Sequence, residues 1–383
     1  MKVLIVTKRL TAGGGATLLT ALIIDALLKL KWEVKVVCYD LDPPDAFRKN
    51  LGIDLSHPKL TIEKINTRLS RRLRWSGYLD SLYLMHFVKR KKYSDYVLFS
   101  TWDEMDFGRK AIQYVHWVSH HPKTVDVNKP ISWSVIAQLR IIYRILLIKL
   151  FFFDSKRVRQ NISIFNSRFT KSLFEKLYGG VSGEIVYPPV QMDGNFSKKF
   201  AEREDGFVYS GRIVRDKNIH LMIEFIEKVR AAGTDIHFHV VGPILDQEYK
   251  NELIRKYPFD WIMIEGNKNR SELSEILGKH KYAIQARYIE PFGMAAAEAA
   301  KLGCLTFVPR RSGLVELLED DSLTFENFSD LFNKFCRLRQ DQNLQTSLSE
   351  RLQHQFSKLT PEAFQNQIQS IFLQAVKHIN SQN

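Results

Sequence analysis

The first forty residues follow the order strand, glycine loop, helix, strand, and this order restricts the fold more than any other feature. The apolar strand VLIV precedes TAGGGAT, the helical run LLTALIIDALLKLK and a second strand, EVKVVCYD. The helical run has apolar residues three and four positions apart, the spacing of a buried helix face. A unit of this kind requires a parallel sheet with a right-handed crossover. The sequence therefore predicts an α/β protein.

The same pattern starts again near the middle of the chain. IVYPPV carries two prolines that interrupt any regular element, and GFVYSGR and HLMIEFIEKVRAAG then predict a strand and an amphipathic helix. IHFHVVG, WIMIEG, YAIQA and LTFVP predict further strands. We expect two Rossmann-like, doubly wound domains over 1–190 and 191–355, facing a central cleft at the carboxyl ends of their strands. A C-terminal helix within 356–383 is expected to return to the first domain.

The positive charge of the chain is confined to its first half. The net charge is +14, and residues 1–190 hold 31 Lys and Arg against 16 Asp and Glu, whereas residues 191–383 hold 25 against 26. This segregation predicts an anionic partner for the first half: a membrane surface, a phosphorylated acceptor or nucleic acid.

The cysteines and the N-terminus indicate a cytoplasmic protein. The three cysteines are far apart and form no CxxC pair, which favours a reducing compartment. MKVLIVTKRL is too short and too charged for a signal peptide.

Two loops have residues suited to phosphate. Gly13–Gly15 lie between a strand and a helix, where the backbone can approach an anion at a helix N-terminus; they match neither the P-loop nor the GxGxxG pattern, and a simple tight turn is the alternative. In SGRIVRDKN, Arg212 and Lys217 follow a strand and Gly211, so they can hold a diphosphate from two directions. Two solvated surface cations are the alternative there.

The stretch YIEPFGMAAAEAAKLG, residues 288–303, carries two glutamates eight positions apart. We expect a helix from about Phe292, with free backbone N–H groups at its start for a diphosphate or sugar hydroxyls. Glu298, two turns further on, suits the diol of a ribose. Among five alanines an unpaired carboxylate would be costly, although a capping and a solvated glutamate remain the alternative.

Together these segments resemble the retaining glycosyltransferases of the GT-B fold, family 4, also called glycosyl transferases group 1. The resemblance rests on Glu-x7-Glu with Phe-Gly after the first glutamate, Gly-Arg-x4-Lys-Asn over 211–218, the Asn-Ser-x-x-Thr of FNSRFTKSLFEKLYG and the Pro-Pro of IVYPPV. It extends over nearly the whole chain and is strongest from 161 to 316. Ala295–Ala297 depart from the bulkier residues common in the family, which leaves the sugar pocket open.

The resemblance implies roles at the matching positions. Arg212 and Lys217 would balance the leaving diphosphate, Glu290 would contact the transferred sugar, and Glu298 would bind the ribose. His116 would lie near the reacting sugar, so the catalytic set is His116, Arg212, Lys217 and Glu290. Further donor contacts are implied for Gly14, Gly15, Gly211, Gly242, Gly266, Asn267, Lys268, Phe292, Gly293 and Met294. No metal site is expected, since His120 and His121 beside His116 lack further ligands at zinc spacing.

The implied reaction is the transfer of a hexose, with retained configuration and without a metal or another cofactor. The donor is a nucleotide diphosphate sugar, with UDP and GDP both open, and the acceptor is a polysaccharide or lipid-linked glycan. Residues 68–93 mix basic and aromatic residues, and 131–153 are apolar but carry Arg140, Arg144 and Lys149. The second segment predicts a helix in the interface of an anionic membrane, so we expect a peripheral protein on the inner membrane face; a core helix with snorkelling cations is the alternative.

Two other functions compete with glycosyl transfer. A sugar-nucleotide epimerase of the same fold would need acid and base residues in another arrangement, and Glu-x7-Glu argues against it. A non-catalytic protein that binds anions or nucleic acid would explain the charge. No nucleic-acid module is recognisable in the sequence, so we expect no nucleic-acid partner.

Overall fold

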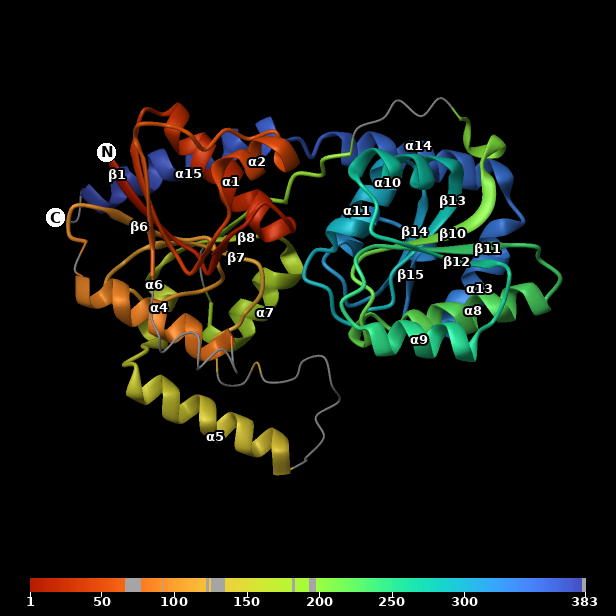
Figure 1. Ribbon diagram of the computed structural model, residues 1–383, viewed down its shortest axis with the longest axis horizontal. Helices are drawn as coiled ribbons and strands as arrows, with labels where there is room; N and C mark the ends of the chain where they lie inside the picture. Colours follow the sequence, from red (N-terminus) through yellow and green to blue (C-terminus); the bar gives the residue numbers. More distant parts are fainter. Residues whose placement is uncertain are drawn as a thin grey trace. The chain divides into compact units, whose positions relative to one another are not determined.

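The computed structural model describes residues 1–65, 77–91, 93–121, 124, 135–180, 183–192 and 198–380. Two segments discussed above lie partly outside these residues: 68–93 at residues 68–76 and 92, and 131–153 at residues 131–134. The chain forms two compact units: unit 1 comprises Met1–Pro189 with Pro361–Asn383, and unit 2 comprises Val190–Thr360. Each is a Rossmann-like α/β unit with a parallel sheet (Figure 1), which confirms the predicted fold class.

Unit 1 is built on a seven-stranded parallel sheet with helices on both faces. The strand order is β5-β3-β1-β6-β7-β8-β9. In that order the strands are Leu60–Lys64, Glu33–Cys38, Lys2–Val6, Val97–Ser100, Ile112–Val115, Ile162–Phe165 and Gly183–Ile185. The short strands β2 (Arg9–Leu10) and β4 (Asp40–Leu41) pair separately.

Two hydrophobic cores lie on the two faces of this sheet. One contains side chains of α1 (Gly15–Lys29), α2 (Pro44–Leu51) and α15 (Pro361–Asn380). The other contains side chains of α4 (Gly77–Lys91), α5 (Val135–Leu150), α6 (Ser155–Gln160) and α7 (Arg168–Tyr178). Figure 1 shows these two sets of helices above and below the sheet.

The last helix belongs to unit 1, although the chain reaches it from unit 2. α15 packs on α1, where the side-chain amides of Gln365 and Gln369 donate to the backbone carbonyls of Leu22 and Ala26 at 3.0 and 2.7 Å. The buried ring of Phe372 meets the edge of Phe99 with ring centroids 4.9 Å apart. The chain therefore closes unit 1 with a helix that is distant in sequence.

Unit 2 has a six-stranded parallel sheet in the order β12-β11-β10-β13-β14-β15. In that order the strands are Ile262–Gly266, His237–Val241, Glu204–Ser210, His280–Ile284, Leu305–Pro309 and Thr324–Phe325. Its α-helices are α8 (Ile219–Ala231), α9 (Gln247–Lys256), α10 (Arg270–Lys279), α11 (Met294–Lys301), α12 (Val315–Leu318), α13 (Phe328–Arg339) and α14 (Gln342–Ser357). Short 3₁₀ turns cover Phe200–Glu202, Arg215–Lys217 and Asp321–Leu323.

Helix caps explain where several helices begin. In the Asn-Ser-x-x-Thr segment the Ser167 hydroxyl accepts from the backbone N–H of Thr170 at 3.1 Å, which satisfies a free donor of the first turn of α7. Asn269 and Glu272 form a reciprocal capping box at the start of α10. Each of these helices follows a strand closely, so the loops between them gather at the carboxyl edge of each sheet.

Two elements end earlier than the apolar runs of the sequence that contain them. AIQYVHWV is a strand only to Val115, because the carboxylate of Asp103 accepts the backbone N–H groups of His116 and Trp117 at 3.1 and 2.9 Å. The predicted helix in 131–153 covers Val135–Leu150. Among the described residues, no helix combines the length and apolar character needed to cross a bilayer.

Candidate functional site

Glycines bring together the carboxyl ends of three neighbouring strands in unit 2. The N–H of Gly211, after β10, donates to the carbonyl of Val241 at 2.9 Å, and the N–H of Gly242, after β11, donates to the carbonyl of Gly266 in β12 at 2.7 Å. All three glycines have positive φ angles, of 146°, 141° and 68°, which other residues rarely adopt. A Cβ at Gly242 would also clash with Gly211. The predicted glycines therefore allow the three strand ends to approach one another closely, and Asn267 and Lys268 follow directly after β12.

The loop after β10 holds the two predicted cations. The Tyr209 hydroxyl donates to the carbonyl of Arg212 at 2.8 Å, while the Arg212 side chain is exposed. Asn218 has φ 55° at the start of α8, and its amide donates to the carbonyl of Ala286 beyond β13 at 3.0 Å. This bond ties the loop after β10 to the loop after β13, and it fixes Lys217 between them.

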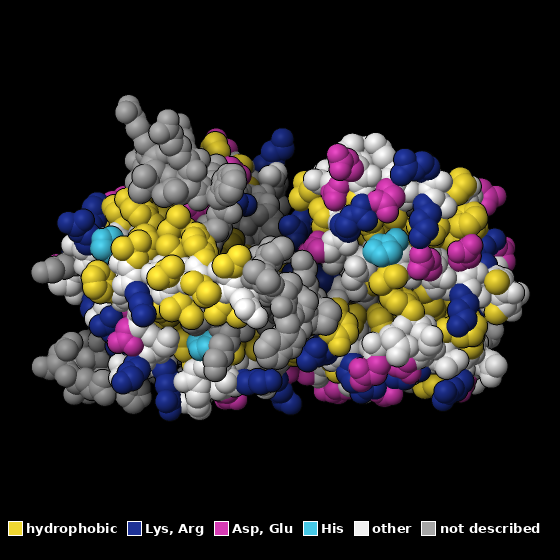
Figure 2. Space-filling model, turned by 90° about the horizontal axis from the view of Figure 1, so that it is seen from below, with side chains coloured by type: hydrophobic (Ala, Val, Ile, Leu, Met, Phe, Trp, Pro, Cys, Tyr) yellow, Lys and Arg dark blue, Asp and Glu magenta, His cyan; other side chains and the backbone are white. Residues whose placement is uncertain are grey.

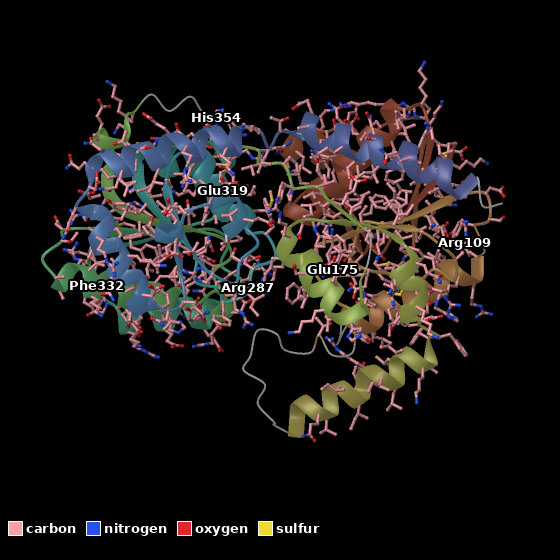
Figure 3. All side chains as sticks on the ribbon, turned by 180° about the vertical axis from the view of Figure 1, so that it is seen from behind. Arg109, Glu175, Arg287, Glu319, Phe332 and His354 are labelled. Carbon is pink, nitrogen blue, oxygen red and sulfur yellow. The ribbon has the colours of Figure 1, made fainter. Side chains whose placement is uncertain are left out.

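Lys217 and Glu290, 73 residues apart in sequence, form an ion pair. The Lys217 ammonium is 3.0 Å from the Glu290 carboxylate, and the two side chains are only 14% and 21% exposed. The guanidinium of Arg287 lies 3.5 Å from the same carboxylate and 3.8 Å from Asp216 (Figure 3 labels Arg287). Positive charge from two loops thus surrounds one carboxylate at the carboxyl edge of the sheet. Arg287 was not predicted, because a lone arginine in a loop has the pattern of a solvated side chain.

The helix after Glu290 begins at Met294, so the predicted start near Phe292 is wrong. Glu290 pairs with the segment after β14: its N–H donates to Arg311 at 3.3 Å and its carbonyl accepts from Gly313 at 2.8 Å. These bonds hold the chain extended at Glu290, and Gly293, with φ 94°, turns it into the helix. The first-turn N–H groups of α11 are therefore those of Met294 and the two alanines after it.

Glu298 lies on α11 among alanines that pack closely. Ala296, Ala297, Ala299 and Ala300 are buried, and the Glu298 carboxyl keeps only part of its surface accessible. Burial raises the pKa of Glu298 to about 7, against a smaller opposing effect of the Arg270 charge. A buried carboxyl with a raised pKa is typical of binding sites, because hydroxyl donors of a ligand would stabilise its ionised form.

The predicted glycines of unit 1 form a turn before α1. Gly14 has φ 90° and precedes the first helical residue, Gly15. The carboxylate of Asp42 accepts the N–H of Ala12 at 2.9 Å, and the Thr17 hydroxyl donates to the carbonyl of Gly13 at 2.5 Å. The turn is thus held by backbone and short side chains, and it leaves the start of α1 without an acidic residue.

His116 lies at the carboxyl end of β7 in unit 1. Its Nε2 is 3.2 Å from the carbonyl of Thr101, and a hydrogen bond there leaves Nδ1 as the acceptor of a neutral ring. Burial lowers the pKa of His116, which favours this neutral form. The Thr101 hydroxyl also contacts Thr20 of α1 at 2.9 Å. Thr101 therefore joins His116 to the helix that follows the glycine turn.

A buried acidic loop positions His116, and sequence reasoning missed it. The Asp103 carboxylate also accepts from the Ser119 hydroxyl at 2.5 Å, and Glu104 accepts the N–H groups of Ser119 and His120 at 2.9 and 2.6 Å. The ring of His121 packs on that of Tyr178 instead. Acids in TWDEMD have the pattern of an exposed loop, and only the structure shows that they bind backbone donors.

Comparison with known proteins agrees with this arrangement. Residues 193–355 match the family model described as glycosyl transferases group 1, which confirms the resemblance to that group for the motifs of unit 2. No curated protein sequence is significantly similar to the chain.

Solved structures share the fold over the whole chain. A sucrose-phosphate synthase from Thermosynechococcus elongatus has a TM-score of 0.69 at 15% identity, over 99% of this chain and 100% of its own. WaaG, a glycosyltransferase involved in lipopolysaccharide biosynthesis, has 0.65 at 13%, over 96% and 99%. The pneumococcal O-GlcNAc transferase GtfA, in complex with UDP and GlcNAc, has 0.64 at 12%, over 97% and 99%. The fold is therefore GT-B.

The raised pKa of Glu298 predicts how stability depends on pH. Below its ordinary pKa of 4.5 the carboxyl is protonated in the folded and unfolded chains alike; between 4.5 and about 7 only the unfolded chain ionises it freely. Relative to Glu298→Gln, wild type should therefore lose on the order of 1–3 kcal/mol of unfolding free energy over this range, and no more above it. Urea unfolding at several pH values measures the difference.

Glu227→Gln, on the exposed face of α8, is the matched control and should show no such trend. A difference between wild type and Glu298→Gln that does not vary with pH would contradict the raised pKa.

Proposed function

Starting from a second unit that matches glycosyl transferases group 1, we propose that the protein moves a hexose from a nucleotide diphosphate sugar to a glycan acceptor with retained configuration. One observation carries the proposal. Lys217 and Glu290 meet at 3.0 Å shortly before the N-terminus of α11, on the same sheet edge as the three glycines with positive φ. Cation, carboxylate and free N–H groups in one place suit a diphosphate joined to a sugar.

Each part of this edge has a role in the proposed donor complex. Arg212 and Lys217 contact the diphosphate, together with the N–H groups at the start of α11. Glu290 accepts from hydroxyls of the transferred hexose, and Glu298 accepts from the ribose diol in its ionised form. Backbone at Gly242, Gly266, Asn267 and Lys268 contacts the base.

The proposed reaction breaks the bond between the anomeric carbon and the diphosphate oxygen. The electron pair stays on that oxygen, where the fixed cations and N–H dipoles stabilise the developing negative charge. The acceptor hydroxyl attacks the face from which the diphosphate departs, and its proton passes to the departing phosphate oxygen. We propose that these cations act without a metal ion. His116, as a neutral ring, would contact the reacting sugar.

Unit 1 has a cavity that supports a phosphorylated acceptor. The cavity, of about 180 Å³, is lined by Lys8, Arg144, Ser119, Tyr78 and Trp117 among others. Two cations beside two aromatic side chains suit a phosphate next to an apolar or sugar group. Burial lowers the pKa of Lys8 to about 8, so its ammonium is still largely protonated at neutral pH.

α5 of unit 1 supports a membrane location for that acceptor. Its inner side packs on the core through Leu147 and Ile148. Its outer side carries apolar residues three and four apart, which are 39–66% exposed: Leu139, Ile142, Tyr143, Ile145, Leu146 and Leu150. Figure 2, seen from the side of α5, shows hydrophobic side chains gathered over this part of unit 1. We propose that this face lies in the interface of an anionic cytoplasmic membrane and presents a lipid-linked glycan to unit 1.

Substitution of the two cations tests the donor role. Arg212→Ala and Lys217→Ala should each lower kcat/KM for sugar transfer by at least about 10²-fold, because each removes a charge fixed toward the leaving diphosphate. The assay follows release of the nucleoside diphosphate, and NMR reads the anomeric configuration of the product. Arg255→Ala, an exposed cation on α9, is the charge-matched control.

Unchanged kcat/KM in both variants would contradict the proposal that Arg212 and Lys217 bind the diphosphate. A product with inverted configuration would contradict the same-face mechanism, and an isomerised sugar nucleotide without transfer would favour the epimerase.

Vesicle binding tests the role of α5. The double variant Ile142→Ser/Leu146→Ser should bind anionic vesicles at least about tenfold more weakly than wild type, because two apolar side chains no longer enter the interface. Flotation with vesicles of about one-third phosphatidylserine measures this, and Leu245→Ser/Ile254→Ser in unit 2 is the control with equally exposed apolar residues. Equal binding by both double variants would exclude α5 as the membrane contact.

A further inference from the structure

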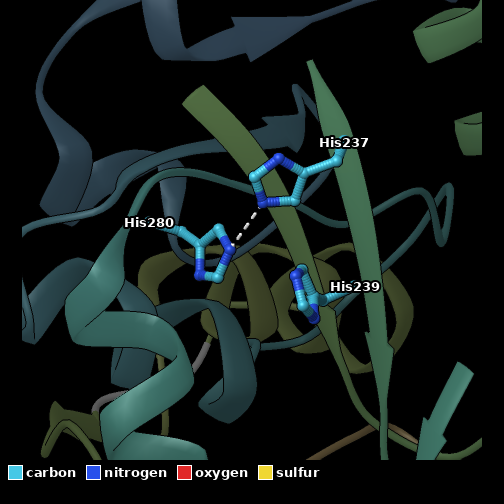
Figure 4. A group of neighbouring side chains, drawn as sticks. All are labelled: His237, His239 and His280. Carbon is cyan, nitrogen blue, oxygen red and sulfur yellow. Dashed lines mark hydrogen bonds between the residues drawn. The ribbon is translucent and has the colours of Figure 1, made fainter. Parts of the chain in front are cut away.

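Three histidines meet at the edge of unit 2 opposite the proposed donor residues. His237 begins β11 and His280 begins β13, the two strands that flank β10. His239 lies two residues after His237 and therefore on the same face of the sheet. The three rings approach one another closely (Figure 4), with centroids 4.4–5.2 Å apart. This cluster lies at the amino ends of the strands, so the donor site does not account for it.

The nitrogen atoms of the cluster are spaced for a shared ligand. One ring nitrogen from each histidine lies within 4.8 Å of the others, and the Nε2 atoms of His237 and His280 are 2.8 Å apart. The carboxylate of Glu204, the first residue of β10, lies 3.7 and 3.6 Å from these two atoms. Ligands at zinc distance in a tetrahedral site are about 3.3 Å apart, so small side-chain rotations would bring four ligands to one ion.

Outer hydrogen bonds orient two of the rings for metal binding. His280 Nδ1 lies 2.6 Å from the carbonyl of Ile276, and His239 Nδ1 lies 2.9 Å from the Glu265 carboxylate, which Lys268 in turn contacts at 3.2 Å. A ring that donates its Nδ1–H to a carbonyl or carboxylate has a lone pair on Nε2. Metal-binding histidines typically have such partners.

The middle strand leaves room for the rings. Gly206 of β10 stands opposite His237 in the register, and a Cβ at this position would overlap both His237 and His280. A hydrogen bond between His237 and His280 would explain the 2.8 Å contact between their Nε2 atoms. It would not explain why the Glu204 carboxylate lies close to both atoms, or why His239 and His280 have hydrogen-bond partners at Nδ1.

We propose that His237, His239, His280 and Glu204 bind one zinc ion, which ties the amino ends of β11, β10 and β13 together. Three imidazole nitrogens and one carboxylate oxygen are a donor set that zinc prefers, and magnesium and calcium do not. The ion would be structural, since all four coordination positions are filled by the protein.

Zinc binding to the whole untagged chain tests the proposal. After equilibrium dialysis against micromolar zinc, elemental analysis should find about one zinc ion per chain, and zinc, but not magnesium, should raise Tm. Glu204→Gln should weaken zinc binding by at least about tenfold, and His239→Gln and His280→Gln by more. His354→Gln, an exposed histidine on α14 (Figure 3), is the control and should bind like wild type.

A wild-type chain that retains no more zinc than His280→Gln would overturn the site, and so would variants that all bind like wild type. If His280→Gln fails to fold by circular dichroism, the spectrum of cobalt-loaded wild type decides. Intense tetrahedral bands support the site, and weak octahedral bands contradict it. The test does not measure glycosyl transfer. The zinc site can therefore fail while the proposed function holds, and the reverse.

Discussion

The ion pair between Lys217 and Glu290 is the contact on which the proposed donor site depends. It forms because β10 and β13 are neighbours in the parallel sheet, so the loops after them meet at one edge. Both side chains are mostly buried, and a charge in that position is strongly unfavourable without a partner. Each of the two charges therefore satisfies the other. In the proposed donor complex Lys217 would turn to the diphosphate, and sugar hydroxyls would donate to the Glu290 carboxylate.

The strands, helices and site residues could be predicted from the sequence more accurately than the contacts between distant segments. Local patterns can be recognised in a single sequence. The alternating strands and helices, the glycines and the two glutamates are patterns of this kind. The start of α11 was missed because Glu290 hydrogen-bonds with the segment after β14, and such a non-local bond leaves no mark near Pro291. The histidine cluster was missed because His280 is 41 residues from His239. Only the HFH pattern of β11, with two histidines on one strand face, could have suggested it.

The two units differ in net charge, and this difference agrees with their proposed roles: unit 2 would bind the donor, and unit 1 the acceptor and the membrane. Unit 2 is nearly neutral along its sequence, and of its two proposed diphosphate-binding cations Lys217 is paired with Glu290, whereas the Arg212 side chain is exposed. The N-terminal half carries the whole positive excess, and α5 adds an outward apolar face. Such a surface suits an anionic membrane, where charge attracts and apolar side chains anchor. Within unit 2, Glu265 contacts both His239 and Lys268. The proposed zinc ion would therefore also stabilise the loop that is proposed to contact the nucleotide base.

Thermal unfolding of the whole chain with UDP, GDP, ADP and their hexose conjugates tests whether unit 2 binds a nucleoside diphosphate sugar. A ligand at about 100 times its Kd stabilises the folded chain by roughly 2.7 kcal/mol. We expect one of these nucleotides to raise Tm and Glu298→Ala to lose most of that shift. No shift with any of them would contradict donor binding by unit 2.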